Sequence, residues 1–457
     1  MDIAGVASAV GGRLADCPNP DVLVTGAAAD SRRVAPGDLY VAILGERVDG
    51  HDFAAAAHES GAVVTLGSRP TGLPTIVVED PVAALGRLAA HTLAALPAAR
   101  VVALTGSSGK TTTKDLIAGL LEDLGPTVAP AGSFNTEVGL PLTILRATEA
   151  TRFLVLEMGA RGLGHIATLC AIARPDVSVV LNVGSAHLGE FGTREVIALA
   201  KGELVEALPP DGVAILNADD PYVAGMAVRT PARVVRFGAS SLAEVRMTGL
   251  ELDAGARPRF TLHAGGAAAP VTMQVVGEHM AANACAAAAV ALELGMPLAR
   301  VAELLSAATP RSQWRMEVAV TPGGVTVVND AYNANPESMR AGLRALAAMR
   351  GEGRSYAVLG EMKELGTNSI AEHDAIGRLA VRLDVSMTIA VGDGARPLYL
   401  GAAQEGSWDG EAQWVPDAPA ALALLRPLLR SGDVVLVKAS RSVGLEQVAR
   451  ALLEEAP

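Results

Sequence analysis

The sequence predicts an α/β protein, and three observations lead to that prediction. A short apolar run at 101–104, rich in β-branched residues, is followed by a glycine-containing loop and then by apolar residues at helical spacing over 113–121. Strand-like and helix-like segments then alternate to about residue 310, which is typical of βαβ units around a mostly parallel sheet. After a break at 307–310 the alternation starts again. We therefore expect two α/β domains after a separate N-terminal block.

The division of the chain follows from its length and its breaks. A chain of 457 residues is long enough for two to four domains. The first block contains short strands and turns, and the stretch 96–99 has the composition of a linker. We expect three domains, at residues 1–97, 98–310 and 311–457. The expected strands are 101–105, 153–157, 177–182 and 213–217 in the central domain, and 325–329, 356–359, 387–391 and 434–437 in the last; a helix is expected over 280–294.

The loop at 105–112 carries the clearest chemistry in the chain. It is a shortened phosphate-binding loop, Gly-x-x-Gly-Lys-Thr, with Leu104 where the longer form has a glycine. Its glycines let backbone N–H groups turn toward an anion, the helix N-terminus adds partial positive charge, and Lys110 adds a full charge. The Thr111 hydroxyl can reach a Mg²⁺ ion. The residues predicted to bind the nucleotide phosphates are Gly106, Ser107, Ser108, Gly109, Lys110, Thr111 and Thr112.

Lysine is scarce in this chain. Only five of the 37 basic residues are lysine, and the others are arginine. Arginine stays protonated and is not a nucleophile, whereas the pKa of a lysine can shift on burial. We therefore expect lysines at positions that need an amine. Lys110 fits this expectation, Lys201 and Lys438 require an explanation, and Lys114 is expected on a helix surface without a special role.

The bulk composition excludes several classes of function. The net charge of −12 and the absence of a basic run argue against a nucleic-acid partner. No uncharged apolar run is long enough to span a bilayer, and the N-terminus lacks the basic start of a signal peptide. Cys17, Cys170 and Cys285 lie far apart, without metal or redox spacing. We expect a cytoplasmic protein without a membrane or nucleic-acid partner.

Polar residues gather where the expected central strands end. In open α/β sheets, ligands lie beyond the carboxyl ends of the strands. Glu157 ends one strand and could bind Mg²⁺ opposite Thr111, or it could merely complement the next helix N-terminus. His187 follows the next strand, although a lone histidine is more often structural. Lys201 lies on an expected helix, where a surface ion pair with Glu203 or a neighbouring acid is the alternative.

The order of these motifs resembles the Mur ligase family over essentially all 457 residues. The matching stretches are Asp30-Ser31-Arg32, Pro36-Gly37-Asp38, Asp49-Gly50-His51-Asp52-Phe53, the loop 105–112, the run 329–336 (Asn-Asp-Ala-Tyr-Asn-Ala-Asn-Pro), 360–366 and 438–442. The run 329–336 is most specific to the branch that adds D-alanyl-D-alanine to UDP-N-acetylmuramoyl-tripeptide. The resemblance implies a UDP-sugar-binding N-terminal domain, a central P-loop domain with a parallel sheet, and a C-terminal Rossmann-like domain that closes over ATP.

The resemblance also implies a metal site. Glu157, His187 and Lys201 match the family's magnesium-binding glutamate, histidine and carbamylated lysine. With Lys110 they would form the catalytic set, and with Thr111 they would bind two Mg²⁺ ions. A carbamate at Lys201 suits the scarcity of lysine, because only a neutral amine takes up CO₂.

Further residues acquire expected roles from the same resemblance. Asn283 matches the asparagine that contacts adenine, and Arg315 matches the linker arginine that reaches the ATP phosphates. Asp330, in the run 329–336, is expected in the nucleotide site. The expected substrate-binding residues are Ser31, Arg32 and Asn135. Thr136 departs from the branch pattern, which often has a second asparagine there.

The implied reaction is ATP-dependent amide formation. The terminal carboxylate of the tripeptide attacks the γ-phosphate and becomes an acyl phosphate, which the amine of D-alanyl-D-alanine then attacks. Two alternatives remain open. One is the family member that adds the third, usually diamino, acid, although the Asp-Asn-Pro-Arg motif typical of that enzyme is absent from this sequence. The other is a P-loop NTPase switch without ligase activity. We expect the chain to act as a monomer.

Overall fold

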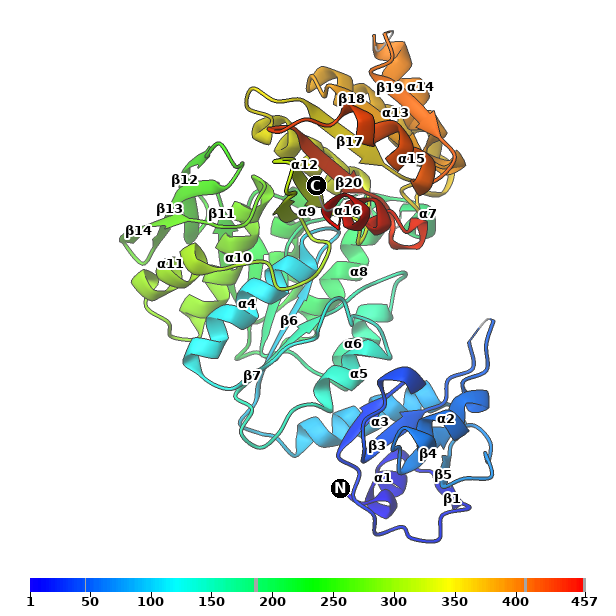
Figure 1. Cartoon of the computed structure of the whole chain (residues 1–457). Coiled ribbons are helices and arrows are strands. Elements are labelled where there is room, and N and C mark those ends of the chain that lie inside the picture. The colour runs from blue at the N-terminus through cyan, green and yellow to red at the C-terminus, as the bar shows by residue number, and fades with distance from the viewer. Residues whose placement is uncertain (46, 185–187, 407–408, 455–457) are drawn as a thin grey trace.

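Three sheets follow one another along the chain. The computed structural model describes residues 1–457 except 46, 185–187, 407–408 and 455–457. Figure 1 shows three bodies in sequence, from the blue N-terminal part through the green central part to the red C-terminal part. This arrangement confirms the predicted α/β class and three-part architecture, whereas the boundaries at residues 97 and 310 stay predictions. Among the described helices, none has the length and apolar character needed to cross a bilayer.

The N-terminal sheet has five strands in the order β1-β5-β4-β3-β2, parallel except for β1. Asp80 begins the helix beside it by accepting hydrogen bonds from the N–H groups of Val82 and Ala83, with Pro81 in the first turn. The elements are α1 (Ile3–Val10), β1 (Arg13–Ala15), β2 (Gly26–Ala28), η1 (Ser31–Arg33), β3 (Asp38–Val41), η2 (Gly50–Phe53), α2 (Ala54–Glu59), β4 (Val64–Gly67), β5 (Thr75–Val77) and α3 (Pro81–Ala94).

The central sheet has nine strands in the order β14-β13-β12-β11-β10-β9-β6-β8-β7. Its elements are β6 (Arg100–Thr105), α4 (Lys110–Leu124), β7 (Thr127–Val128), α5 (Gly139–Ile144), β8 (Phe153–Glu157), α6 (His165–Ile172), β9 (Val177–Val180), α7 (Leu188–Phe191), α8 (Arg194–Glu206), β10 (Val213–Asn217), α9 (Pro221–Ala224), η3 (Gly225–Arg229), β11 (Arg233–Gly238), β12 (Val245–Leu252), β13 (Pro258–Ala264), β14 (Ala267–Thr272), α10 (His279–Glu293) and α11 (Leu298–Ala307).

Both faces of the central sheet are buried around β6, β8 and β9, as the continuous apolar strands there predict. In β6, Val102 and Leu104 pack in the cluster with α4 and α10, and Val101 and Ala103 pack in the cluster with α6 and α8. This alternation is the two-residue period of a strand. The expected strands and the helix at 280–294 are confirmed to within a few residues.

One end of the central sheet differs from the mostly parallel prediction. Strands β12, β13 and β14 form antiparallel pairs, and β13 joins β14 through Gly265 and Gly266, both with positive φ. Two such residues make the tight turn that suits a two-residue hairpin. Sequence analysis did not use this glycine pair, which was the available indication of a hairpin.

The C-terminal sheet has six strands in the order β15-β16-β20-β17-β18-β19, with only β15 antiparallel. The elements of this part are β15 (Glu317–Val320), β16 (Thr326–Asn329), α12 (Pro336–Met349), β17 (Ser355–Leu359), η4 (Gly366–Asn368), α13 (Ser369–Arg382), β18 (Met387–Val391), η5 (Asp393–Ala395), α14 (Arg396–Glu405), β19 (Ala412–Val415), α15 (Ala418–Leu425), η6 (Arg426–Leu428), β20 (Val434–Lys438), η7 (Arg441–Val443) and α16 (Glu446–Leu453).

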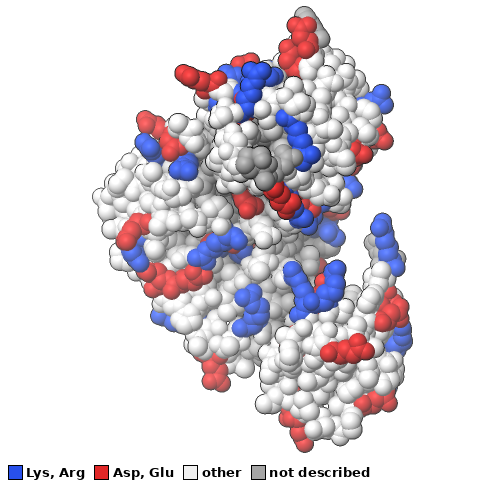
Figure 2. Space-filling model, in the orientation of Figure 1, with Lys and Arg blue, Asp and Glu red and all other residues white. Residues whose placement is uncertain are grey.

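The surface of the molecule carries charges of both signs. Figure 2 shows acidic and basic side chains interspersed on the face in view, without a broad basic area.

Candidate active site

The predicted phosphate-binding loop lies between β6 and α4 and opens into a cavity. Gly109 has φ +78°, and a side chain there would meet Asn283 Oδ1 at 2.6 Å. Only glycine fits this combination of a left-handed conformation and close approach. The Ser108 N–H donates to Asn182 Oδ1 over 2.9 Å, and Lys110 Nζ donates to the Gly106 carbonyl over 2.7 Å. Burial lowers the pKa of the Lys110 ammonium. The loop is therefore preformed for an anion.

A group of oxygen atoms lies beside the loop, where β8 ends. Thr111 Oγ1 donates to Glu157 Oε2 over 2.9 Å, and Asn135 Nδ2 donates to Glu157 Oε1 over 2.7 Å. Glu157 is only 1% exposed. Its alternative role, complementing a helix N-terminus, is not what these contacts show. Both of these donors are neutral, so the buried carboxylate lacks a compensating cation in these contacts, and a buried charge is costly without one.

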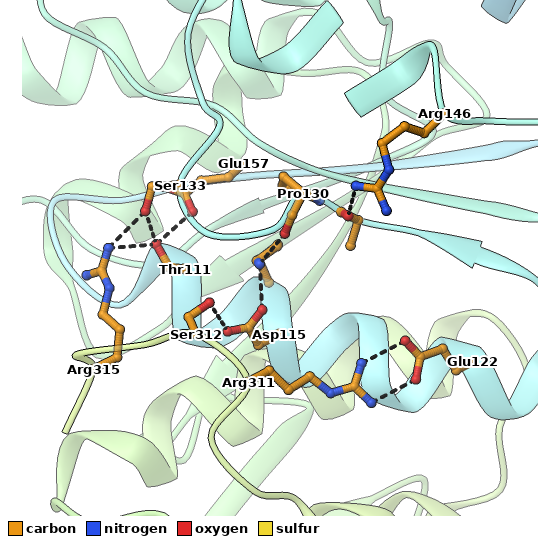
Figure 3. A network of polar contacts seen from close by, with 12 residues as sticks. Thr111, Asp115, Glu122, Pro130, Ser133, Arg146, Glu157, Arg311, Ser312 and Arg315 are labelled. Carbon is orange, nitrogen blue, oxygen red and sulfur yellow. Dashed lines mark hydrogen bonds and ion pairs between the residues drawn. The ribbon is translucent and has the colours of Figure 1, made fainter. Parts of the chain in front are cut away.

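Arg315 reaches this group from the segment between the central and C-terminal sheets. Its Nη2 donates to Thr111 Oγ1 over 3.0 Å and to Ser133 Oγ over 2.8 Å, as Figure 3 shows. Its guanidinium also lies over the Tyr332 ring, 4.1 Å from the centroid. Within the described part of the chain, Arg315 Nε is buried without a hydrogen-bond partner. A phosphate oxygen is a suitable acceptor for such a donor.

Lys201 is buried in α8 at 4% exposure. Burial lowers the pKa of its ammonium well below the usual value, and the charge of Lys110 lowers it further. The predicted alternative, an ion pair with Glu203, is wrong, because Glu203 instead accepts the N–H groups of Gly164 and Ala167 at the start of α6. No ion pair or hydrogen bond of Lys201 Nζ is found among the described residues. His187 lies outside the described residues.

The opposite wall of the cavity comes from α10 and the C-terminal domain. Asn283 is buried, and within the described residues its neighbour His279 has a buried Nδ1 without a hydrogen-bond partner. Asp330 Oδ1 accepts the Met316 N–H over 3.1 Å, and Asp330 Oδ2 lies 2.5 Å from Lys438 Nζ. Both Asp330 oxygens are thus engaged within the protein.

One cavity of about 810 Å³ collects most of the predicted site. Four of the described predicted residues lie outside its lining, and one of them is Gly106, which directly precedes Ser107 in the phosphate-binding loop. Lys201 is buried and is not among the lining residues, and Ser31 and Arg32 lie on η1 of the N-terminal domain, where Arg32 pairs with Asp30 over 2.8 Å. The predicted residues that line it are Ser107, Ser108, Gly109, Lys110, Thr111, Thr112, Asn135, Glu157, Asn283, Arg315 and Asp330.

Sequence analysis missed several residues of this site. Ser133 bonds Arg315, Asn182 fixes the phosphate-binding loop, and Asn335 Nδ2 donates to the Ser107 carbonyl over 3.3 Å across the two domains. Asn182 ends the expected strand 177–182, and Asn335 lies in the run 329–336, so both had a signal in the sequence. Nothing local in the sequence distinguishes Ser133.

Comparisons with known proteins agree with this geometry. Three family models match in chain order: the Mur ligase family catalytic domain at residues 23–92, the Mur ligase middle domain at 104–291, and the Mur ligase glutamate ligase domain at 314–441. The UDP-N-acetylmuramoyl-tripeptide–D-alanyl-D-alanine ligase of Mycobacterium bovis is 52% identical, covering 100% of this chain and 98% of its own. The enzyme of the same name from Escherichia coli is 35% identical, covering 95% of each chain.

Solved structures give the same answer. Crystal structure I of MurF from Acinetobacter baumannii superposes with a TM-score of 0.89 at 31% identity, covering 100% of this chain and 99% of its own. MurF from Thermotoga maritima in complex with ADP gives a TM-score of 0.82 at 32% identity, covering 95% and 98%. The chain belongs to the Mur ligase family.

Proposed function

We propose that this chain joins D-alanyl-D-alanine to UDP-N-acetylmuramoyl-tripeptide in peptidoglycan precursor synthesis, with conversion of ATP to ADP and phosphate. The observation that carries the proposal is the 52% identity, over the whole chain, to ligases named for this reaction. The cavity supports it, because Arg315 and Asp330 there face the phosphate-binding loop of the central domain. The chain is an ATP-dependent, ADP-forming ligase.

ATP is the co-substrate that the cavity would bind. The loop from Gly106 to Thr112 and Lys110 would hold the phosphates, because N–H groups at a helix N-terminus and an ammonium face the same space. Arg315 would add a second cation, and its Nε, which has no hydrogen-bond partner among the described residues, would donate to a phosphate oxygen. Asn283 would bind the adenine edge with its amide. Asp330 would hold the C-terminal wall of the site in place through its contacts with Met316 and Lys438.

Magnesium fits the oxygen group at the end of β8. Mg²⁺ prefers oxygen ligands, and the Thr111 hydroxyl and the Glu157 carboxylate supply them. Two Mg²⁺ ions would offset phosphate charge during transfer. We further propose that Lys201 is carbamylated and that its carbamate and His187 complete the ligand set. The fit rests on the burial of Lys201, which lowers the pKa of its ammonium and so favours the neutral amine, the form that reacts with CO₂.

The chemistry needs no protein nucleophile. The tripeptide carboxylate attacks the γ-phosphorus of ATP, the bond to the β-γ bridging oxygen breaks, and ADP leaves. The neutral amine of the dipeptide then attacks the acyl phosphate carbonyl, expels phosphate and gives up a proton to form the amide. Lys110 and Arg315 stabilise the charge that develops on the transferred phosphoryl group, a task of positioning and electrostatics.

The remaining assignments concern the large substrate and the working form of the chain. Residues 1–97 would bind the UDP-sugar, and Ser31 and Arg32 would be among the residues that contact it. Asn135, held by Glu157, would face the substrate carboxylate from the central domain. We propose domains at 1–97, 98–310 and 311–457, and a chain that works as a monomer in the cytoplasm.

Two alternatives have weaker support. A solved ligase that adds 2,6-diaminopimelate superposes with a TM-score of 0.56 at 18% identity, which shows a shared fold alone. A P-loop NTPase switch would hydrolyse ATP without an acceptor amine. Neither alternative accounts for the full-length identity to tripeptide–dipeptide ligases.

The test is ADP release with a panel of UDP-muramyl peptides, each with and without D-alanyl-D-alanine, together with product mass. We expect ADP release that requires both substrates, and a product heavier by one dipeptide less water. Addition of a diamino acid to a UDP-muramyl dipeptide would assign the rival ligase activity. ADP release that is independent of any acceptor would assign an NTPase.

A further inference from the structure

Lys114 and Lys438 are buried lysines, at 1% and 2% exposure, and each lies beside an aspartate. The expectation that Lys114 lies on a helix surface is therefore wrong. Lys114 Nζ donates to the Pro130 carbonyl over 2.6 Å and lies 2.5 Å from Asp115 Oδ1. Lys438 Nζ lies 2.5 Å from Asp330 Oδ2. In a chain with five lysines, two of them pair with aspartates in two different domains, of which Asp330 is buried and Asp115 is partly buried.

The second oxygen of each aspartate holds the same short segment, residues 311–316. Asp115 Oδ2 accepts the Ser312 hydroxyl over 2.6 Å, as Figure 3 shows. Asp330 Oδ1 accepts the Met316 N–H over 3.1 Å. The segment joins the central and C-terminal sheets, so one lysine–aspartate pair fixes its start from the central domain and the other fixes its end from the C-terminal domain.

Arg315 lies between these two attachments. The residues on either side of it, Trp314 and Met316, have φ of +58° and +51°, which is costly for residues other than glycine. Such a conformation persists only where the surroundings hold it in place. Tertiary contacts, rather than local preference, thus keep the guanidinium directed at Thr111 and Ser133.

We propose that Lys114 and Lys438 are positioning residues for Arg315, acting through Asp115 and Asp330 on the segment 311–316. The proposal rests on the proposed function, in which Arg315 stabilises the transferred phosphoryl group. Each ammonium holds one oxygen of its aspartate and so fixes the orientation of the carboxylate, which keeps the second oxygen directed at the segment as an acceptor. The two lysines therefore act on phosphoryl transfer without touching ATP.

A double-mutant cycle tests this coupling. Arg315→Ala should lower kcat/KM for ATP by about 100-fold, as loss of a transition-state cation does. Lys438→Met should lower it by about 10-fold or more, as removal of a supporting partner does, while KM for the UDP-tripeptide stays unchanged. The double variant should be no slower than Arg315→Ala alone, because Lys438 acts through Arg315. If the fold loss in kcat/KM for ATP of the double variant equals the product of the two single losses, the proposal is overturned.

The central-domain side gives a second cycle if Lys438→Met does not fold. Ser312→Ala removes one hydroxyl and leaves the Lys114–Asp115 pair intact. It should lower kcat/KM for ATP by a few-fold in the wild type and by nothing in Arg315→Ala, and equal losses in both backgrounds would overturn the proposal.

Two controls complete the design. Leu425→Ala, in the core of the C-terminal domain, matches the stability loss without touching the segment, so its effect should combine independently with Arg315→Ala. Product mass from the wild type is measured first. A wild type that makes no ligated product refutes the proposed function, whereas ligated product with independent costs refutes only the positioning role.

Discussion

Lys201 and Lys438 are both buried, but within the described residues only Lys438 has a hydrogen-bond or ion-pair partner. Lys438 donates to the Asn333 carbonyl and pairs with Asp330, and that carboxylate opposes the fall in the lysine pKa that burial causes. No such contact of Lys201 exists among the described residues, and the nearby charge of Lys110 lowers its pKa further. A paired buried amine remains a cation that holds structure. An unpaired one becomes a neutral nucleophile, which is the form that CO₂ modifies.

Lys110→Ala should have the largest effect. The Lys110 charge is proposed to bind the phosphates, and it also lowers the pKa of Lys201. We expect ligation to fall by about 1000-fold or more, since a preformed cation at the transferred phosphate is lost. ADP release by the purified variant measures this, and circular dichroism checks that the fold is kept. Near-normal turnover in a folded variant would remove Lys110 from the site.

Lys201→Arg distinguishes a carbamate from a simple cation. Arginine keeps the positive charge but cannot take up CO₂, so we expect at least a 100-fold loss of ligase activity. Lys201→Ala should fail as well, and added acetate should partly restore it by supplying carboxylate oxygens. The same acetate should leave the wild type unchanged. Full activity of Lys201→Arg would exclude the carbamate.

The two lysines should differ in stability when both are replaced by methionine. Lys438→Met leaves Asp330 buried without its cation, which costs about 3–5 kcal/mol and lowers the Tm by about 10 °C. Lys201→Met removes a buried amine that has no partner among the described residues, so it should leave the Tm unchanged or raise it in metal-free protein. Differential scanning calorimetry with EDTA measures both. Equal losses would mean that Lys201 also has a structural partner.

The smallest effect concerns the buried thiols. They test whether burial disfavours the charged form of an acidic group, as it does for the lysine ammonium groups. Burial raises the pKa of Cys170 and of Cys285 to about 12, so almost no thiolate exists at pH 8. Cys17 is only half-buried. A thiol-reactive chromophore should therefore modify Cys17 within minutes and the other two only after unfolding. Rapid reaction of three thiols in the native protein would show that burial does not control these groups.

Contiguous features were predictable from the sequence, whereas contacts between distant segments were not. The loop 105–112, its flanking strand and helix, and Glu157 at a strand end all follow from local periodicity and residue type. The attachment of Ser312 to Asp115 joins segments almost 200 residues apart, and neither residue belongs to a motif. Burial of Lys114 depends in the same way on the distant carbonyl of Pro130.

The antiparallel end of the central sheet shows a second limit. The alternation of strands and helices correctly predicts a parallel sheet up to β11, because each crossover helix leaves a periodic pattern. Beyond β11 no described helix separates the strands up to β14, and half of β14 is alanine, followed by a proline, which is a weak strand pattern. Pairing with β13, rather than local preference, makes this segment a strand.

The uneven burial of the five lysines has a practical consequence for amine chemistry. All five lie in the described part of the chain, and Lys363 is the only exposed one among them. Lys363 lines the cavity that contains the phosphate-binding loop. Coupling with an N-hydroxysuccinimide ester will therefore concentrate on this position and on the N-terminus. A biosensor surface prepared by amine coupling would attach the molecule at the cavity and so understate substrate binding. A fluorophore coupled to Lys363 would instead report substrate binding in that cavity.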